Sequence, residues 1–450
     1  MAGRLNAWAG AIWLPGVGRL GAVGLRSRRL GLAAASTFAG KFVNLVVQMV
    51  QVPLLVSAMG IDLYGEAVAT VAFLGVLAGF DLGFGAAVKN AVAELVGRRE
   101  TAALPSVVIK AAAWSGLVSA VAGGILLLAP GCYAPLPGSG AILRMLDADT
   151  ATRWLAVALV VTAIPLTTAT QCVEGLQLTW LVNACRMAAA FTGLGVTVEM
   201  ASAISQRWQL VTLLSAVPVL GGVGTCLVLW QHLPRSRSGP RDTVSLVRLV
   251  RDGMPFMLPI VASLLVTNAP QLAILAADGS SAVTRYVVGQ RMMAVFIQPL
   301  TFVMAPLWPA FVEARASGDG DWVARQVRRA SWAAVAYCST VTLIAVACGR
   351  WVAAAWVGRP DAIPTVDEMT AIAVAAGMAA VVQPGSMLLN AYRRFQLATT
   401  VAVLQIGLAF AYEPLARVAG PASVPAAQGL FGLLVIVPAV VVESRAALRR

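Results

Sequence analysis

Long apolar runs separated by short polar stretches fill the chain from residue 31 onward. A helix needs about 20 apolar residues to cross a ~30 Å hydrocarbon core, because each residue adds 1.5 Å. Helices are the expected spanning form, since they satisfy every backbone polar group within the segment. The runs predict an all-α membrane protein with about twelve spanning helices. We place them at residues 31–58, 66–88, 106–130, 153–172, 177–198, 209–231, 253–277, 282–311, 330–349, 366–390, 396–417 and 421–442.

The pattern occurs twice, and the two copies are related by a nearly constant offset along the chain. The separation of Gly60 from Gly279 equals that of Glu94 from Glu313. Nearly the same offset relates Pro53 to Pro270, Trp114 to Trp332, Pro165 to Pro384, Gln177 to Gln396, and Pro218 to Pro438. Landmarks in one order at nearly one offset indicate two homologous halves. Six helices per half is an even number, so both halves enter the membrane in the same sense, as parallel repeats do.

The basic loop between the sixth and seventh helices divides the chain. We expect a cytoplasmic tail at 1–30, an N-lobe at 31–231, a cytoplasmic linker at 232–252, a C-lobe at 253–443 and a second cytoplasmic tail at 444–450.

Composition and charge agree with this division. Only 12% of the residues are charged, about half the share of soluble domains, ~25%. Of the 33 Lys and Arg residues, 23 fall on the side of the termini, 7 on the other side and three inside spans. This positive-inside bias predicts both termini in the cytoplasm. The net charge of +13 therefore reflects topology, and we expect no nucleic-acid partner.

Three predicted helices carry a polar seam at helical spacing. The seams comprise Thr37, Lys41, Asn44, Gln48 and Gln51 in the first helix, Thr179, Asn183 and Arg186 in the fifth, and Thr284, Arg291 and Gln298 in the eighth. The three cations lie nine or ten residues inside their helices, hence ~14 to 15 Å deep. Fixed positive charge at mid-depth from both halves predicts a cavity for an anion, with phosphate or pyrophosphate the natural candidate.

Other buried residues have competing interpretations. Asp81 in the second helix either balances the charge of Lys41 or couples an ion, and Arg186 could instead pair with a loop carboxylate. The stripe of Gly75, Gly79 and Gly83 predicts close helix packing. His232 is the only histidine and the six cysteines lack metal-type spacing, so we expect no metal site and no cofactor.

Two long stretches resemble a known family. They are DLYGEAVATVAFLGVLAGFDLGFGAAVKN and YVVGQRMMAVFIQPLTFVMAPLWPAFVEARASGDGDWV, with Tyr64-Gly65, Asp81-Leu82-Gly83, Gln290-Arg291, Pro306-Leu307-Trp308-Pro309, Glu313 and Gly318-Asp319 as their landmarks. They are similar to the polysaccharide-biosynthesis, O-antigen flippase branch of the multidrug/oligosaccharidyl-lipid/polysaccharide (MOP) exporter superfamily. The resemblance implies a V-shaped, two-lobed, MATE-like transporter and no enzyme. It further implies movement of an undecaprenyl-pyrophosphate-linked oligosaccharide from the inner to the outer leaflet of the bacterial cytoplasmic (inner) membrane by alternating access.

In this interpretation the anionic head group of the lipid-linked oligosaccharide binds in a central cavity. We expect substrate contacts from Lys41, Arg186, Arg291, Asn44, Gln48 and Gln298, and charge balance or ion coupling from Asp81. Partners are the lipid-linked oligosaccharide, membrane lipids, and a polysaccharide polymerase and other assembly proteins.

Two alternatives stay open. A multidrug/cation antiporter of the same superfamily should prefer an acidic cavity. A membrane glycosyltransferase or polymerase should have large outer loops with a carboxylate or histidine, whereas the outer loops of this chain are short and offer mainly Asp62, Asp147, Asp149, Asp361, Asp367 and Glu368. The sequence leaves the sugar repeat, the coupling ion and the oligomeric state open.

Overall fold

The structure, a computed structural model, describes residues 22–79, 81, 83–98, 100–233, 244–304, 306–392, 394 and 396–448. Within these residues the regular structure is helical and contains no strand. Twelve segments are long and apolar enough to cross a membrane. The predicted all-α class and the predicted number of spans are confirmed.

The first half, which we call the N-lobe, comprises eight α-helices. They are α2 (Ala22–Met59), α3 (Ile61–Ala78), α4 (Phe84–Gly97), α5 (Leu104–Leu128), α6 (Ser139–Ala148), α7 (Thr150–Gly175), α8 (Thr179–Met200) and α9 (Arg207–His232).

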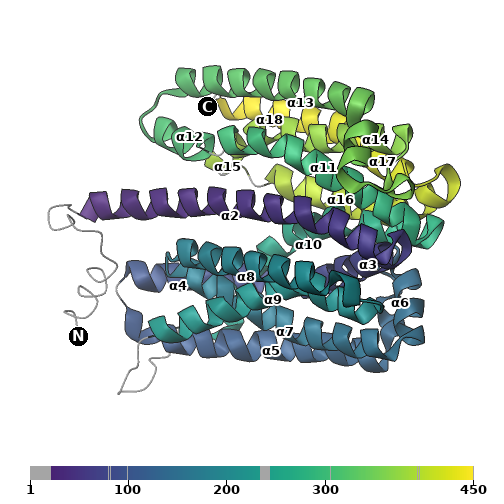
Figure 1. The fold of residues 1–450 in the computed structure, drawn as a ribbon. Helices are drawn as coiled ribbons and strands as arrows, with labels where there is room; N and C mark the ends of the chain where they lie inside the picture. The colour runs from purple at the N-terminus through teal and green to yellow at the C-terminus, as the bar shows by residue number, and fades with distance from the viewer. Residues whose placement is uncertain are drawn as a thin grey trace.

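The second half, the C-lobe, comprises α10 (Leu246–Asp278), α11 (Ser280–Met304), α12 (Leu307–Ala316), α13 (Gly320–Val357), α14 (Val366–Val381), α15 (Gln383–Ala391), α16 (Gln396–Ala419), α17 (Ser423–Phe431) and α18 (Val437–Leu448). Helix α2 runs between the two lobes (Figure 1). We call the end of the molecule where α2 turns into α3 the turn end. The opposite end, where α2 begins and toward which α18 runs, is the terminal end (Figure 1).

The repeat is visible in the backbone. Helices α2 and α10 end at Met59 and Asp278, which correspond at the same offset as the sequence landmarks. Gly60 and Gly279 follow with φ of 82° and 85°. Such positive φ values cost other residues about 1–2 kcal/mol, so glycine at both turns has a physical reason. Helices α3 and α11 then start at once, as expected of two related halves.

Charged clusters at the turn end follow the same offset. In the N-lobe the guanidinium of Arg207 lies 2.6 Å from the Glu66 carboxylate and 3.9 Å from that of Asp149. In the C-lobe Arg285 pairs with Glu368 at 3.2 Å. Positions 66 and 285 correspond, as do 149 and 368. In the C-lobe this pair joins the second span directly to the start of the fourth, whereas in the N-lobe Arg207 at the start of α9 links the two corresponding carboxylates.

Asp149 also caps α7, because its carboxylate accepts hydrogen bonds from the Thr152 N–H at 3.2 Å and the Thr152 hydroxyl at 2.5 Å. Burial raises the pKa of the Asp149 carboxyl, but these hydrogen bonds and the charge of Arg207 outweigh burial and hold the pKa below its ordinary value.

Three predicted spans are interrupted in the structure. The span predicted at 66–88 is two helices, α3 and α4, separated at residues 79–83. Gly83 has φ of 75°, and the Asp81 carboxylate accepts hydrogen bonds from the N–H groups of Gly83 and Gly85, both at 3.0 Å. An aspartate between glycines thus supplies a turn within an apolar run. A pattern that tracks only hydrophobicity does not register this turn.

Proline accounts for the other two breaks, because it cannot donate a backbone hydrogen bond. The span predicted at 282–311 divides into α11 and α12 at Pro306, and the span predicted at 366–390 divides into α14 and α15 next to Pro384. The last span contains a π-helical turn at Gly432–Ile436.

The outermost helices are longer than predicted. Helix α2 begins at Ala22 instead of residue 31, and α18 reaches Leu448 instead of residue 442. Arginine is a good helix former, so the helix continues past the apolar run. The predicted tail at 1–30 lies partly, and the middle of the predicted linker at 232–252 wholly, outside the described residues. The domain limits stay predictions.

The lobes meet closely along α3 and α10. A Cβ built on Gly79 would overlap Leu264 Cδ1, and one built on Gly83 would overlap the Gly253 carbonyl oxygen. The predicted role of the glycine stripe in close helix packing is confirmed.

At the turn end, hydrogen bonds join the lobes. The Ser280 hydroxyl donates to the Asp62 carboxylate at 2.8 Å, and the Thr284 hydroxyl donates to the Ile61 carbonyl at 2.5 Å. The Trp356 indole N–H also reaches the Met49 carbonyl of α2 at 2.7 Å.

Candidate functional site

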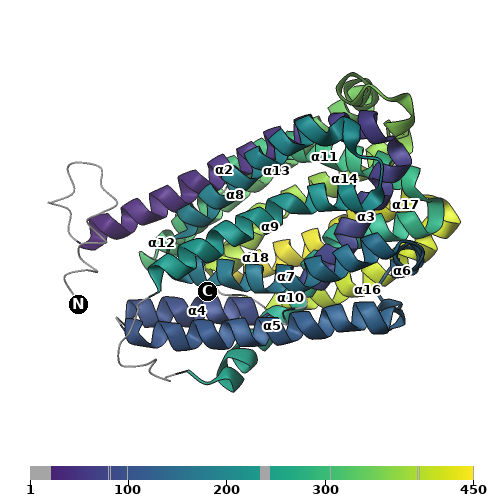
Figure 2. The ribbon, with the colours of Figure 1, turned by 60° about the horizontal axis from the view of Figure 1, so that its bottom comes forward.

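Helices α2 and α8 run side by side in a fixed register (Figure 2). The Asn183 amide donates to the Thr37 hydroxyl at 3.0 Å, and the Gln51 amide donates to the Thr197 hydroxyl at 3.0 Å. Each bond joins residues 146 apart in sequence. The two helices are therefore parallel, and Lys41 of α2 lies at the level of residue 187, beside Arg186 of α8.

Lys41 faces the space between α8 and α11. On α2, Thr37 and Gln51 point toward α8, whereas Gln48 bonds to α11 and the Phe38 ring lies 4.1 Å from the Phe302 ring of α11. At 100° per residue, Lys41 falls between these two directions.

Arg186 projects to the same side. On α8, Asn183 points toward α2, whereas Ala189 and the stem of Arg186 lie against Gly221 of α9. The guanidinium therefore leaves α8 between α2 and α9. Lys41 points between α8 and α11, and Arg186 points between α2 and α9. Because α2 and α8 are parallel, we infer that the two side chains lie on the same side of this helix pair. The structure places two of the three predicted cations at the same level on adjacent helices, both of them exposed.

Arg291 stands nearer the turn end. Its Nη1 donates to the Gln48 Oε1 at 2.7 Å, which joins α11 to α2 across the lobes. Gln48 and Arg291 both lie 11 residues from the turn ends of their helices, roughly 16 Å. Lys41 is seven residues further toward the terminal end, roughly 10 Å. The three cations were predicted at one depth. Instead they occupy two levels, because the depth of Lys41 was counted from one end of its long span and the depth of Arg291 from the opposite end of its own.

Helices α2, α8, α9, α3 and α11 contact one another in that cyclic order. Helix α3 ends at Ala78. Lys41 and Arg186 lie about level with this end of α3, at the limit of the part of the ring that α3 completes.

None of the three cations forms an ion pair within the described part of the chain, and Arg291 is only half-buried. Other basic residues on the same helices or their neighbours do: Arg285 of α11 lies 3.2 Å from Glu368, and Arg207 of α9 lies 2.6 Å from Glu66. The predicted alternative in which Arg186 pairs with a loop carboxylate has no support among the described residues.

Two of the remaining predicted site residues, Asn44 and Gln298, lie on the same helices as Lys41 and Arg291. Asn44 is exposed on α2, about one turn from both Lys41 and Gln48, and Gln298 is half-buried on α11, seven residues from Arg291 toward the terminal end. Asp81 is separate from them in its contacts, because both carboxylate oxygens accept hydrogen bonds from the start of α4. Its contacts are those of a helix cap, and its pairing with Lys41 is not seen among the described residues.

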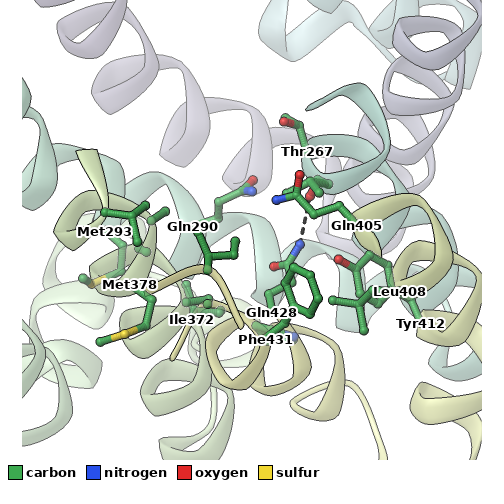
Figure 3. Close-up of a pocket in the computed structure, with 18 of the residues that line it drawn as sticks. Thr267, Gln290, Met293, Ile372, Met378, Gln405, Leu408, Tyr412, Gln428 and Phe431 are labelled. Atoms are coloured by element: carbon green, nitrogen blue, oxygen red, sulfur yellow. Dashed lines mark hydrogen bonds between the residues drawn. The ribbon is translucent and has the colours of Figure 1, made fainter. Parts of the chain in front are cut away.

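A partly open cavity of about 240 Å³ lies within the C-lobe, lined by residues of α10, α11, α14, α16 and α17 (Figure 3). Its walls are mostly apolar, with Met293, Ile372, Leu408 and Phe431 among them. Polar groups come from Thr267, Tyr286, Gln290, Gln405, Tyr412 and Gln428. Sequence reasoning missed this cavity, although the spacing of Gln405 and Tyr412, seven residues apart on one helix, was an available signal.

Several solved structures share this arrangement. An inward-facing multidrug resistance MATE family transporter of the MOP superfamily matches with a TM-score of 0.61 and 16% identity, covering 91% of this chain and 98% of that chain. A variant of the Vibrio cholerae MATE transporter VcmN matches with a TM-score of 0.61 and 14% identity over 94% of this chain and 98% of that chain. This chain has the MATE transporter fold.

An outward-facing MATE transporter of the MOP superfamily also matches, with a TM-score of 0.58 and 14% identity over 93% of this chain and 95% of that chain. No protein-family model and no curated protein matches the chain. In this MATE fold α2 and α11 contact each other across the lobes, and α8 packs against α2 within the N-lobe. The chain is thus a multi-pass membrane protein whose described residues place unpaired positive charge next to the lobe interface.

Proposed function

We propose that this protein is a flippase for a lipid-linked oligosaccharide with an anionic head group, undecaprenyl pyrophosphate being the expected carrier. The observation that carries the proposal is a set of cations, Lys41, Arg186 and Arg291, that lie beside the lobe interface without an ion pair among the described residues. Lys41 and Arg186 are exposed and Arg291 is half-buried, so a bound phosphate could reach all three and form charge-assisted hydrogen bonds with them. The resemblance of the sequence to the O-antigen flippase branch supports the same substrate class.

The two levels of charge suggest a path. Lys41 and Arg186 would meet the pyrophosphate first from the terminal end, which the positive-inside bias predicts to face the cytoplasm. Arg291 would receive it about 10 Å further in. Its planar guanidinium can bind phosphate bidentately, and Gln48 holds it in position before substrate arrives. Asn44 and Gln298 would add hydrogen bonds to the same head group, and lobe rearrangement would then open the turn end.

Binding to the purified full-length protein tests the charge set. The probes are undecaprenyl pyrophosphate and undecaprenol, which differ only in the head group. We expect Arg291→Gln to weaken pyrophosphate binding by roughly tenfold to a hundredfold, since hydrogen bonds to charged groups contribute about 1.5–3 kcal/mol. Lys41→Gln and Arg186→Gln should act in the same direction. The matched control is Arg328→Gln, which removes an exposed cation from α13, a helix that carries none of these three cations. Equal affinities of the Arg291 and Arg328 variants would refute the proposal.

Transport can be measured with a fluorescent lipid-linked sugar in proteoliposomes. Arg291→Glu should abolish flipping while protein yield and melting temperature stay near wild type, because the carboxylate repels the head group. Full activity of Arg291→Glu contradicts the proposed role.

A multidrug antiporter is the second candidate, favoured by the likeness in fold to multidrug MATE transporters. Ethidium efflux from the same proteoliposomes under a proton or sodium gradient separates the candidates. Efflux that survives Arg291→Gln but is lost in Asp81→Asn, without pyrophosphate binding in the wild type, would favour the antiporter.

A further inference from the structure

The C-lobe cavity differs in its polar groups from the cationic seam, the name we give to Lys41, Arg186 and Arg291. Among the described residues that line it there is no Asp, Glu, Lys, Arg or His. Its polar groups are three glutamine amides, two phenol hydroxyls and one threonine hydroxyl. Amides and hydroxyls both donate and accept hydrogen bonds. The lining therefore suits a ligand with neutral groups of both kinds and offers no counter-charge for an ion.

One polar group in this cavity lacks a partner of its own. Tyr412 is fully buried, and its hydroxyl has no hydrogen bond of good geometry among the described residues. The nearby Gln428 amide instead donates to the Val266 carbonyl at 2.9 Å (Figure 3). The Tyr286 hydroxyl receives only a long bond of 3.4 Å from the Gln290 amide. Unsatisfied buried hydroxyls are uncommon, and a ligand or water that completes them is the usual explanation.

The walls favour a ring-shaped neutral ligand. Apolar and aromatic side chains, among them Ile372, Leu408 and Phe431, cover much of the surface. A sugar ring presents C–H groups on its faces and hydroxyls at its edge, so it can contact both kinds of lining. A volume of about 240 Å³ is slightly below the ~300 Å³ lower limit of drug-sized pockets, which suits a single ring.

The cavity adjoins the cationic seam through α11. Gln290 faces the cavity, while its neighbour Arg291 faces α2, and adjacent Cα atoms are about 3.8 Å apart. A ligand whose anionic group binds Arg291 could therefore place an attached neutral ring beside Gln290. We infer that the C-lobe cavity binds an uncharged sugar ring attached to the anionic head group, with Tyr412, Gln405 and Gln428 supplying the hydrogen bonds. This inference rests on the proposed function and extends it to substrate selection.

The experiment compares lipids with and without a sugar on the full-length protein. The probes are undecaprenyl pyrophosphate and the same lipid carrying one glucose, galactose or N-acetylglucosamine. We expect the wild type to bind at least one sugar-bearing lipid more tightly than the sugar-free lipid. Tyr412→Phe and Gln405→Leu should reduce that difference by about two- to tenfold each. Neither should change the affinity for the sugar-free lipid, whereas Arg291→Gln should weaken binding of both lipids.

Stability separates ligand binding from packing. Removing an unsatisfied buried hydroxyl should leave the melting temperature of Tyr412→Phe unchanged or raise it. Ser444→Ala is the matched control, because its buried hydroxyl in α18 also lacks a partner but lies outside the cavity. It should leave both affinities unchanged.

The outcomes distinguish the two proposals. If the wild type binds all three sugar-bearing lipids no more tightly than the sugar-free lipid, the cavity inference is overturned while the flippase proposal stands. If Tyr412→Phe and Ser444→Ala behave alike, the cavity inference is also overturned. If neither the sugar-free nor the sugar-bearing lipids bind, the proposed flippase function itself is refuted.

Discussion

Replacing Gly65 by alanine tests whether the lobe contact at the turn end controls the conformation of the protein. Gly65 lies in α3, where it packs against the start of α11. A Cβ built there would overlap the Ser280 carbonyl oxygen and lie 2.7 Å from its carbon and 2.8 Å from the Thr284 hydroxyl oxygen. The obstacle is largely backbone, which cannot rotate away as a side-chain tip can, so the lobes must move apart.

The magnitude follows from the cost of overpacking. An added methyl group in a filled contact costs about 1–3 kcal/mol. Movement would also lengthen the hydrogen bonds from Ser280 to Asp62 and from Thr284 to Ile61, each of which contributes about 1 kcal/mol. The overpacking cost of about 1–3 kcal/mol falls only on the state with the turn end closed, so by itself it shifts the balance toward the open state by about 5- to 150-fold.

Pulsed electron paramagnetic resonance measures this shift directly. Spin labels on Arg144→Cys and Val366→Cys, both exposed at the turn end of opposite lobes, report the lobe separation in a background without the native cysteines. Gly116→Ala is the matched control, because no atom lies within 4 Å of the Cβ it would add. Gly65→Ala should enlarge the long-distance population, and Gly116→Ala should not. Identical distance distributions and melting temperatures in both variants would refute this reasoning.

The turn-end charges yield further predictions. Breaking the pair between Arg285 and the buried Glu368 by Glu368→Gln should lower the free energy of unfolding by about 3–5 kcal/mol, measured by thermal unfolding in detergent. Glu413→Gln, which breaks an exposed pair on α16, should cost less than about 0.5 kcal/mol, and equal losses would contradict the role of burial. The pKa of Asp149 is lowered on folding, so its contribution to stability is present above its unfolded value near 3.9 and is lost as pH falls through the folded value. Asp149→Asn should therefore flatten the fall in melting temperature below about pH 4, and an unchanged slope would argue against this linkage.

Much of the architecture could be predicted because the membrane makes strong demands on sequence. Apolar length determines the spans, and the constant offset that relates Gly60 to Gly279 indicates the repeat that the backbone shares. The candidate site was only partly predictable. Helical spacing placed Gln48 and Lys41 on one face of α2, but no periodicity reveals which residue of another helix stands opposite.

Patterns along the chain were enough to predict the all-α membrane class, the twelve spans and the glycine stripe, because these depend on local composition and on spacing along one helix. The packing of the helices was needed to show that Gln48 meets Arg291, that Asp81 caps α4, and that Lys41 lies level with Arg186 and apart from Arg291. It also gathered Gln405, Tyr412 and Gln428 around one cavity. Such pairings depend on how helices distant in sequence contact one another, and no local pattern in a single chain encodes those contacts.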